Sequence, residues 1–100
     1  MSESKNMEKI RLSSHVRFRA VVDEGVLVHL ENGRAMVVNE VGLFIVETLG
    51  RQIMTVEELA DSVTGAFEVD ADQARTDVGV FLDELRGEQV IDTVSVLATG

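Results

Sequence analysis

The chain has 100 residues, the size of one domain with a single hydrophobic core. Apolar residues make up 45% of it, although Trp and Tyr are absent. Because Cys is also absent, disulfides and thiolate metal sites are excluded. The formal net charge of −9 disfavours partners with phosphate backbones.

The charge is distributed unevenly along the chain. Residues 1–22 carry five cations and two acids, a net of +3, and the remainder carries four cations and 16 acids, a net of −12. Such a field repels nucleic acid and favours basic partners, although surface acids also simply keep a small domain in solution. No apolar run stands in the first 15 residues or reaches the ~18 residues that a bilayer requires. We therefore expect a soluble, cytoplasmic protein that binds neither nucleic acid nor membrane.

A polar segment and three strand-like runs make up the first part of the chain. Residues 1–14 are mainly polar and show no periodicity, so we expect them to form a disordered tail. The runs that follow are short and rich in β-branched residues, and they comprise residues 16–22, 26–30 and 34–38. This composition predicts three β-strands.

Glycine-containing turns separate the predicted strands. Asn32-Gly33 favours a two-residue type I′ turn, which needs a positive φ at both central positions. Asp23-Glu24-Gly25 closes the first hairpin if Gly25 takes the left-handed conformation. The turns predict a three-stranded antiparallel meander in which the second strand is central and the third lies at an edge.

Two helices are predicted directly after the sheet. Asn39 is a suitable N-cap for the first helix, which we expect to end at Gly50. Thr55 and Glu58 have the spacing of a capping box, in which each side chain satisfies a free backbone N–H of the helix start. Apolar residues recur at helical spacing after both start signals.

A third, longer helix is predicted to begin at Asp70. Its surface is acidic, because Arg75 and Arg86 are outnumbered by six acids, which are Asp70, Asp72, Asp77, Asp83, Glu84 and Glu88. In a nucleic-acid-binding winged helix the third helix usually enters the groove, so this charge argues against DNA binding. We expect Val90-Ile91 to close the domain.

Three strands followed by three helices predict an α+β fold of the winged-helix type. We expect one domain over residues 15–91, after the disordered tail of residues 1–14. Residues 92–100 are mildly apolar and form either a C-terminal tail or an added strand.

The sequence offers no group equipped for catalysis. His15 and His29 are the only imidazoles, and they can form a metal pair only if the first hairpin brings them together with an acid. Ser13 and Ser14 have no activating context, and the glycines stand at turns and helix ends rather than in a phosphate-binding loop. We therefore expect no enzymatic activity, no cofactor and no metal.

Seven short motifs follow one another between about His15 and Ile91, namely Val16-Arg17-Phe18-Arg19, Gly25-Val26-Leu27-Val28, Asn32-Gly33-Arg34, Val38-Asn39-Glu40-Val41-Gly42, Thr55-Val56-Glu57-Glu58-Leu59-Ala60, Ala74-Arg75-Thr76-Asp77-Val78 and Phe81-Leu82-Asp83-Glu84-Leu85. Their ordered succession resembles the PqqD-like family. Members of that family are small peptide chaperones, also called precursor-peptide recognition elements. They bind the leader of a ribosomally made peptide and present it to a modifying enzyme. The resemblance implies two partners, a leader peptide and a maturase such as a radical S-adenosylmethionine enzyme.

Two departures from the family pattern affect the expected groove. Ala35 and Met36 stand where relatives commonly have aromatic residues, which suggests a groove of different shape and a different leader. Gln89 stands where the family tends to have Gly, and Gly87 lies two residues earlier. The third helix is therefore expected to end slightly differently.

The resemblance places the guest peptide beside the third strand and against the third helix. An edge strand leaves unpaired N–H and C=O groups, which an extended peptide completes by adding a strand. The implied peptide-binding residues are Arg34, Ala35, Met36, Val37 and Val38 for the ladder, Ala74, Val78, Phe81 and Leu82 for the apolar wall, and Asp77 for a cation of the guest.

Strand alternation divides the roles of the third strand. Val38 leads into the helix and is expected in the core, which puts Met36 on the same inner face, with Ala35 and Val37 opposite. Ordinary core packing for the apolar residues of this set and a solvated surface for Asp77 remain the simpler interpretations.

A second function remains open, that of a protein-interaction or dimerisation domain that docks on a partner enzyme without binding a leader peptide. An open sheet edge can template dimerisation. Residues 93–97 are also able to occupy that edge in the same or a neighbouring chain. Both a monomer and a homodimer are therefore compatible with the sequence.

Overall fold

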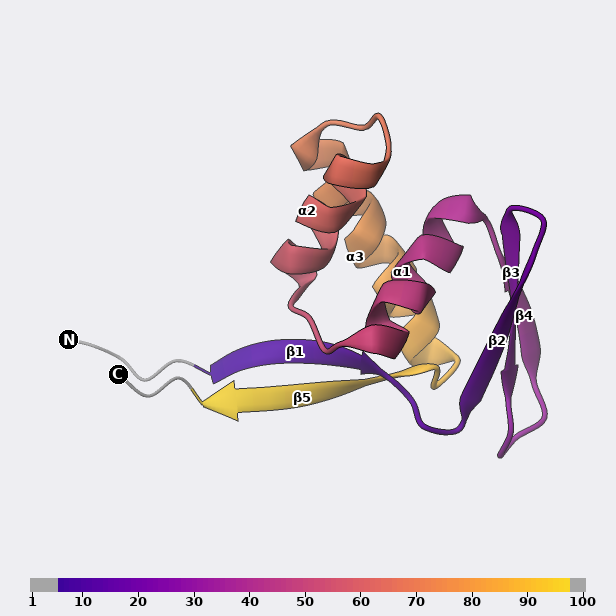
Figure 1. The fold of residues 1–100 in the computed structure, drawn as a ribbon. Coiled ribbons are helices and arrows are strands. Elements are labelled where there is room, and N and C mark those ends of the chain that lie inside the picture. The colour runs from indigo at the N-terminus through magenta and orange to yellow at the C-terminus, as the bar shows by residue number, and fades with distance from the viewer. Residues whose placement is uncertain (1–5, 98–100) are drawn as a thin grey trace.

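The computed structural model describes residues 6–97, which form a three-stranded sheet, a two-stranded ribbon and three helices (Figure 1). In chain order the elements are β1 (Asn6–Leu12), β2 (Val16–Val21), β3 (Glu24–His29), β4 (Ala35–Val38), α1 (Glu40–Arg51), α2 (Val56–Ala66), α3 (Ala71–Gly87) and β5 (Ile91–Leu97). The predicted α+β, winged-helix-like class is confirmed.

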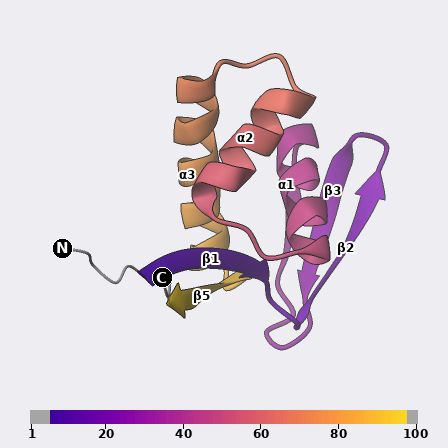
Figure 2. The same ribbon diagram turned by 60° about the vertical axis from the view of Figure 1, so that its left-hand side comes forward.

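The three-stranded sheet has the order β2-β3-β4, and both pairs are antiparallel. As predicted, β3 is central and β4 lies at an edge. Alternate residues point towards the helices, so that Val16, Leu27 and Val38 are buried in the core. All three helices lie on one side of this sheet (Figures 1 and 2).

The first hairpin turns at a different residue from the one predicted. Val22, not Gly25, has the positive φ, at 59°. Gly25 lies inside β3, where an added Cβ would stand 3.0 Å from Leu43 Cδ1 and 3.0 Å from Val38 Cγ2. A side chain at this position would therefore crowd the packing of the sheet against α1, and the prediction of a left-handed Gly25 was wrong.

The second hairpin has a wider loop than the predicted type I′ turn. Gly33 has a φ of 71°, but Asn32 has no positive φ. The N–H of Gly33 donates to the carbonyl oxygen of His29 at 2.8 Å, and the N–H of His29 donates to that of Arg34 at 2.8 Å. The loop between the bonded residues His29 and Arg34 therefore has four residues. Asn32-Gly33 predicted the position of the loop correctly but not its turn type.

The helix starts agree with their sequence signals. Asn39 Oδ1 accepts a hydrogen bond from the N–H of Gly42 at 2.9 Å, and Thr55 forms the complete capping box with Glu58. Asp70 caps α3 through the N–H of Gln73. Helix α1 continues past the predicted end at Gly50 by one residue.

The two ends of the described chain form a ribbon rather than free tails. Strand β1 pairs with β5 in antiparallel register, from Asn6 opposite Leu97 to Leu12 opposite Ile91. Ile10 is 1% exposed and exchanges two backbone hydrogen bonds with Met54, of 2.6 and 3.0 Å. The prediction of a disordered tail therefore fails for residues 6–12, because their partners lie far along the sequence.

The C-terminal segment, for which a tail and an added strand were both open, is a strand as far as residue 97. Residues 1–5 and 98–100 of the two predicted tails lie outside the described residues. Within the described part, no helix combines the length and apolarity needed to cross a membrane.

Candidate functional site

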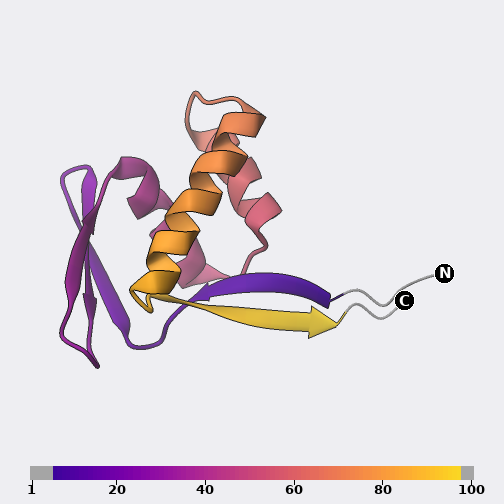
Figure 3. The same ribbon diagram turned by 180° about the vertical axis from the view of Figure 1, so that it is seen from behind.

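The outer edge of β4 is unpaired within residues 6–97. Strand β5, which contains the segment that was considered as a possible cover, pairs with β1 instead. The edge and α3 lie on the same side of the molecule, the side seen in Figure 3. An extended segment therefore has access to this edge in the described structure.

The backbone groups on this edge belong to Ala35 and Val37. Residues of an antiparallel pair alternate between bonded and non-bonded positions. Since the N–H of His29 donates to the carbonyl of Arg34, the next bonded residues of the strand are Met36 and Val38, opposite Leu27 and Gly25. Ala35 and Val37 consequently direct their N–H and C=O groups outward.

The side chains of β4 alternate as predicted. Val38 is buried and Met36 half-buried on the helix side, while Ala35 and Val37 are exposed on the opposite face. A strand added at this edge would alternate in the same way, with every second side chain directed towards the helices.

A cavity of about 190 Å³ lies where β4 runs into α1, and it faces the middle of α3. Its lining consists of Asn39, Val41, Gly42, Ile45, Asp77, Val78 and Phe81. The Phe81 ring reaches Gly42 so closely that an added Cβ there would stand 2.9 Å from Phe81 Cζ and 2.8 Å from Val38 Cβ. Gly42 therefore allows the sheet edge, α1 and α3 to converge at the cavity.

An ion pair closes the opposite end of the edge. Arg34 at the start of β4 lies 3.2 Å from a carboxylate oxygen of Glu88, the C-cap residue of α3. The space behind this pair, between Met36 and Val90, is only about 10 Å³. The groove between β4 and α3 is thus open at its Val38 end and closed at its Arg34 end.

The residues predicted for the apolar wall divide into two groups. Ala74 and Leu82 are 0% and 1% exposed and belong to the core, so they contribute to the groove only by supporting α3. Val78 is also buried but lines the cavity, together with the half-buried Phe81. Asp77 lies exposed at the rim, where its Oδ1 accepts a hydrogen bond from Gln73 at 2.9 Å.

Sequence reasoning missed several groove residues on α1 and after α3. Asn39, Val41, Gly42 and Ile45 line the cavity, and Glu88 closes the groove. Because the third strand leads directly into the first helix, the sequence alone places Gly42 about one helical turn after the end of that strand. No local pattern, however, tells that α3 approaches it there.

The first hairpin does bring the two imidazoles together. The rings of His15 and His29 stack with centroids 6.0 Å apart, and Glu31 lies 3.9 Å from His15 Nε2. His29 is buried, and its Nδ1 accepts hydrogen bonds from the N–H groups of Glu31 and Asn32 at 3.2 and 3.4 Å. Among the described residues no three His, Cys, Asp or Glu side chains are placed to hold a metal. His29 instead organises the loop before β4.

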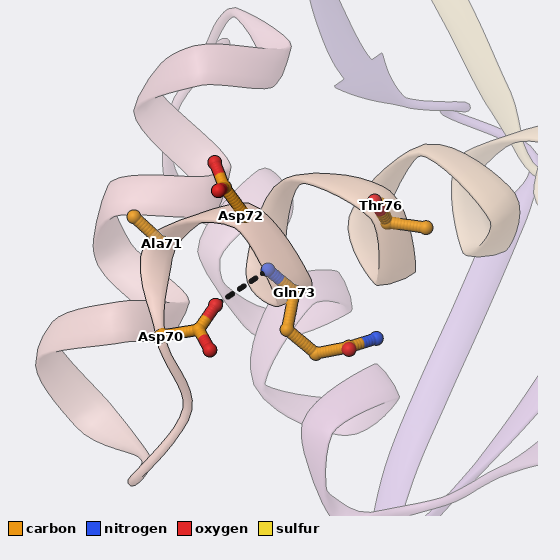
Figure 4. Close-up of a pocket in the computed structure, with 5 residues that line it drawn as sticks. All are labelled: Asp70, Ala71, Asp72, Gln73 and Thr76. Carbon is orange, nitrogen blue, oxygen red and sulfur yellow. Dashed lines mark hydrogen bonds between the residues drawn. The ribbon is translucent and has the colours of Figure 1, made fainter.

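The acids that line a wide hollow of about 420 Å³ at the start of α3 have structural roles (Figure 4). Asp70 Oδ1 accepts a hydrogen bond from the N–H of Gln73 at 2.8 Å, and Asp72 forms an ion pair with Arg75 at 3.4 Å. All residues that line the hollow are exposed. These acids cap the helix and oppose its positive end.

Two comparisons with known proteins bear on this groove, and the family match spans all its residues. Residues 24–91 match the family described as "Coenzyme PQQ synthesis protein D (PqqD)". The solved structure "TbiB1 in Complex with the TbiA(beta) Leader Peptide" is 27% identical, with a TM-score of 0.74 over 82% of this chain and 94% of that chain. No curated protein matches.

Proposed function

This chain belongs to the PqqD family, and from that premise we propose that it is a non-catalytic chaperone for the leader of a ribosomally made precursor peptide. The leader adds as a strand at the open edge of β4, and the chain presents it to a modifying enzyme. The observation that carries this proposal is the unpaired β4 edge beside the groove of α3. The structural relative, whose title names a complex with a leader peptide, supports it.

Affinity in this mechanism comes from the backbone. Ala35 and Val37 each offer one donor and one acceptor, which an extended guest can satisfy without any demand on its sequence. The guest must give up its disorder on binding. We therefore expect dissociation constants from micromolar to high nanomolar, roughly −8 to −9 kcal/mol.

Selectivity comes from the guest side chains that point towards the helices. Those opposite Met36 and Val38 face inward, and the latter lies nearest the cavity of about 190 Å³. Val78 and Phe81 make this cavity suited to an aliphatic or aromatic side chain, while Asp77 at its rim suits a Lys or Arg. The charge contributes to the association rate and to selectivity more than to affinity.

The decisive test removes one outward N–H from the edge. Val37→Pro deletes that donor but spares the ladder to β3, and proline is tolerated on edge strands. We expect the affinity for a fluorescently labelled precursor peptide to fall at least about tenfold, since a ladder bond to the guest is lost. Anisotropy titration measures this effect.

Val37→Ala is the matched control, because it truncates the same side chain but keeps the N–H. Its affinity should stay within about threefold of that of the unchanged chain, since Val37 contributes its backbone rather than its side chain. Circular dichroism establishes that both variants are folded. If folded Val37→Pro and Ala35→Pro both bind the peptide normally, strand addition is refuted.

The rival function, an interaction domain that pairs without a leader peptide, has one observation in its favour. The edges of both β2 and β4 are unpaired within the described residues, and open edges also template dimers. Light scattering decides between the two functions. A dimer that dissociates in Val37→Pro, together with no peptide binding, supports the rival.

A further inference from the structure

One face of the three-stranded sheet points away from the helices and is uncovered in the described structure (Figure 1). Most of its side chains are apolar. We name it the valine face, and it consists of Val21, Val26, Val28, Ala35 and Val37. Val37 is 62% exposed, Val21 47% and Val28 38%. Contiguous exposed apolar surface of this kind marks interaction sites.

Two arginines border the valine face along β2. Arg17 is paired with Val28 across the strands, and Arg19 with Val26. Neither arginine forms an ion pair with any described carboxylate, although the chain has a net charge of −9. The carbonyl oxygens of Ser14 and Val16, at 2.9 and 3.1 Å, hold the Arg17 guanidinium in place without neutralising it.

Of the five other arginines, all except Arg51 are compensated by carboxylates among the described residues. Ion pairs with carboxylates are formed by Arg11, Arg34, Arg75 and Arg86. The cations beside the valine face are thus available to a second molecule. Glu24, opposite Val21, is the acid on this face and lies at its hairpin end.

We propose that the valine face is the docking surface for the modifying enzyme, which meets it with an apolar patch bordered by carboxylates. This inference rests on the proposed function and assigns the surface that the enzyme uses. An acidic partner is repelled by most of this acidic chain and attracted at Arg17 and Arg19. The charge distribution therefore selects the docking orientation.

The size of the valine face indicates a transient complex. Three strands about 4.8 Å apart and at most about 20 Å long span roughly 300 Å² in plan. A stable complex buries about 800 Å² on each partner. By itself the valine face therefore supplies only part of the area of a permanent interface, and it suits an enzyme that releases its substrate carrier after each turnover.

The valine face is also continuous with the groove. A guest strand beside β4 extends the same sheet, and its side chains opposite Ala35 and Val37 point out on this face. The enzyme then contacts the carrier and the guest together. By linkage, the bound guest raises the affinity of the carrier for the enzyme, and the enzyme raises that for the guest by the same factor.

The test compares two charge reversals of equal size. Arg19→Glu alters the border of the valine face, whereas Arg51→Glu alters an exposed arginine in the last turn of α1 that also forms no ion pair with a described residue. The probe is the purified enzyme that modifies the peptide used above. For each variant, anisotropy gives the affinity for the peptide, and mass spectrometry gives the rate of its modification.

We expect Arg19→Glu to lower the modification rate at least about tenfold while the affinity for the peptide stays within about twofold, because the changed charge lies at the docking surface and not in the groove. Arg51→Glu should alter neither quantity. The defect should also diminish as ionic strength rises, since salt screens the repulsion.

A second pair of substitutions leaves the net charge of the protein unchanged. Val28→Thr preserves the shape and strand preference of the side chain but makes the face polar, and Val80→Thr does the same at an exposed position of α3. Only Val28→Thr should slow modification.

Normal modification by both Arg19→Glu and Val28→Thr would overturn the inference. So would a parallel loss of peptide affinity, which would place the effect in the groove, or a dimer of the unchanged chain that Arg19→Glu dissociates. If the unchanged chain does not bind the peptide at all, the proposed function is refuted, and this inference is refuted with it. The binding titration reveals this outcome before any enzyme is added.

Discussion

Gly42 is the residue on which the shape of the groove most directly depends. Its missing side chain leaves room for Val38 on one side and Phe81 on the other, at distances that no Cβ tolerates. Helix α1 carries a glycine in its first turns despite the low helix propensity of that residue. The close approach of β4, α1 and α3 explains why a residue of low helix propensity stands at this position.

Gly42→Ala should therefore destabilise the protein and weaken peptide binding. Better helix propensity contributes up to about 1 kcal/mol, but overpacking costs about 1–3 kcal/mol, and displacement of Phe81 reshapes the cavity. Urea unfolding and peptide titration measure the two effects. Gly79→Ala in α3 is the control, because an added Cβ meets nothing within 4 Å there, and it should be stabilising by about 0.5–1 kcal/mol.

His29 has a structural role in the loop that leads into β4. We expect His29→Leu to destabilise the protein by about 1–2 kcal/mol, because the N–H groups of Glu31 and Asn32 lose their acceptor. His29→Asn should recover part of this loss, since its side-chain oxygen can accept. His15→Gln, at an exposed position, should change the unfolding free energy by less than about 0.5 kcal/mol. Equal losses for His29→Leu and His29→Asn would contradict the loop assignment.

Among the elements, β1 differs most from its sequence expectation. Its polar composition predicts no strand, yet one deeply buried side chain and a bridge to Met54 attach it to the helices. The element therefore packs on the same core as the family-matched region, although that match begins only at residue 24.

Ile10→Ala tests the contribution of β1. The loss of a fully buried side chain should cost about 2–4 kcal/mol of unfolding free energy. On the same strand Arg11→Ala removes an exposed ion pair with Asp92, of 3.5 Å, and should cost less than about 1 kcal/mol. Chemical denaturation compares both variants, and similar small losses would mean that β1 does not support the core.

At the scale of the whole molecule, we expect the acidic surface to govern the encounter with the guest peptide. A net charge of −9 attracts basic peptides from all directions, whereas Asp77 acts at the rim of the groove. Asp77→Asn and Asp83→Asn change the net charge equally, but Asp83 forms its ion pair with Arg86 on the exposed surface of α3.

For a guest with a Lys or Arg, Asp77→Asn should lower the association rate by about three- to tenfold at low salt, and Asp83→Asn by less than about twofold, because charges close to the site steer most strongly. Stopped-flow fluorescence measures both rates. Equal effects of the two variants would assign steering to the overall field alone.

Local signals along the chain were sufficient for the strand alternation around Met36, for the caps at Asn39 and Thr55, and for the start of the third helix next to Asp70. These features arise from periodicity and from hydrogen bonds between residues three apart, so a short window of sequence contains all their causes. The ordered motifs likewise sufficed to indicate the family.

Contacts between distant segments settled the remaining features. The pairing of β1 with β5, the packing role of Gly25, the closure of the groove by Arg34 and Glu88, and the meeting of Gly42 with Phe81 each join segments that no local pattern connects. Their geometry follows from how the helices pack on the sheet, and close packing makes each such position depend on side chains elsewhere in the chain.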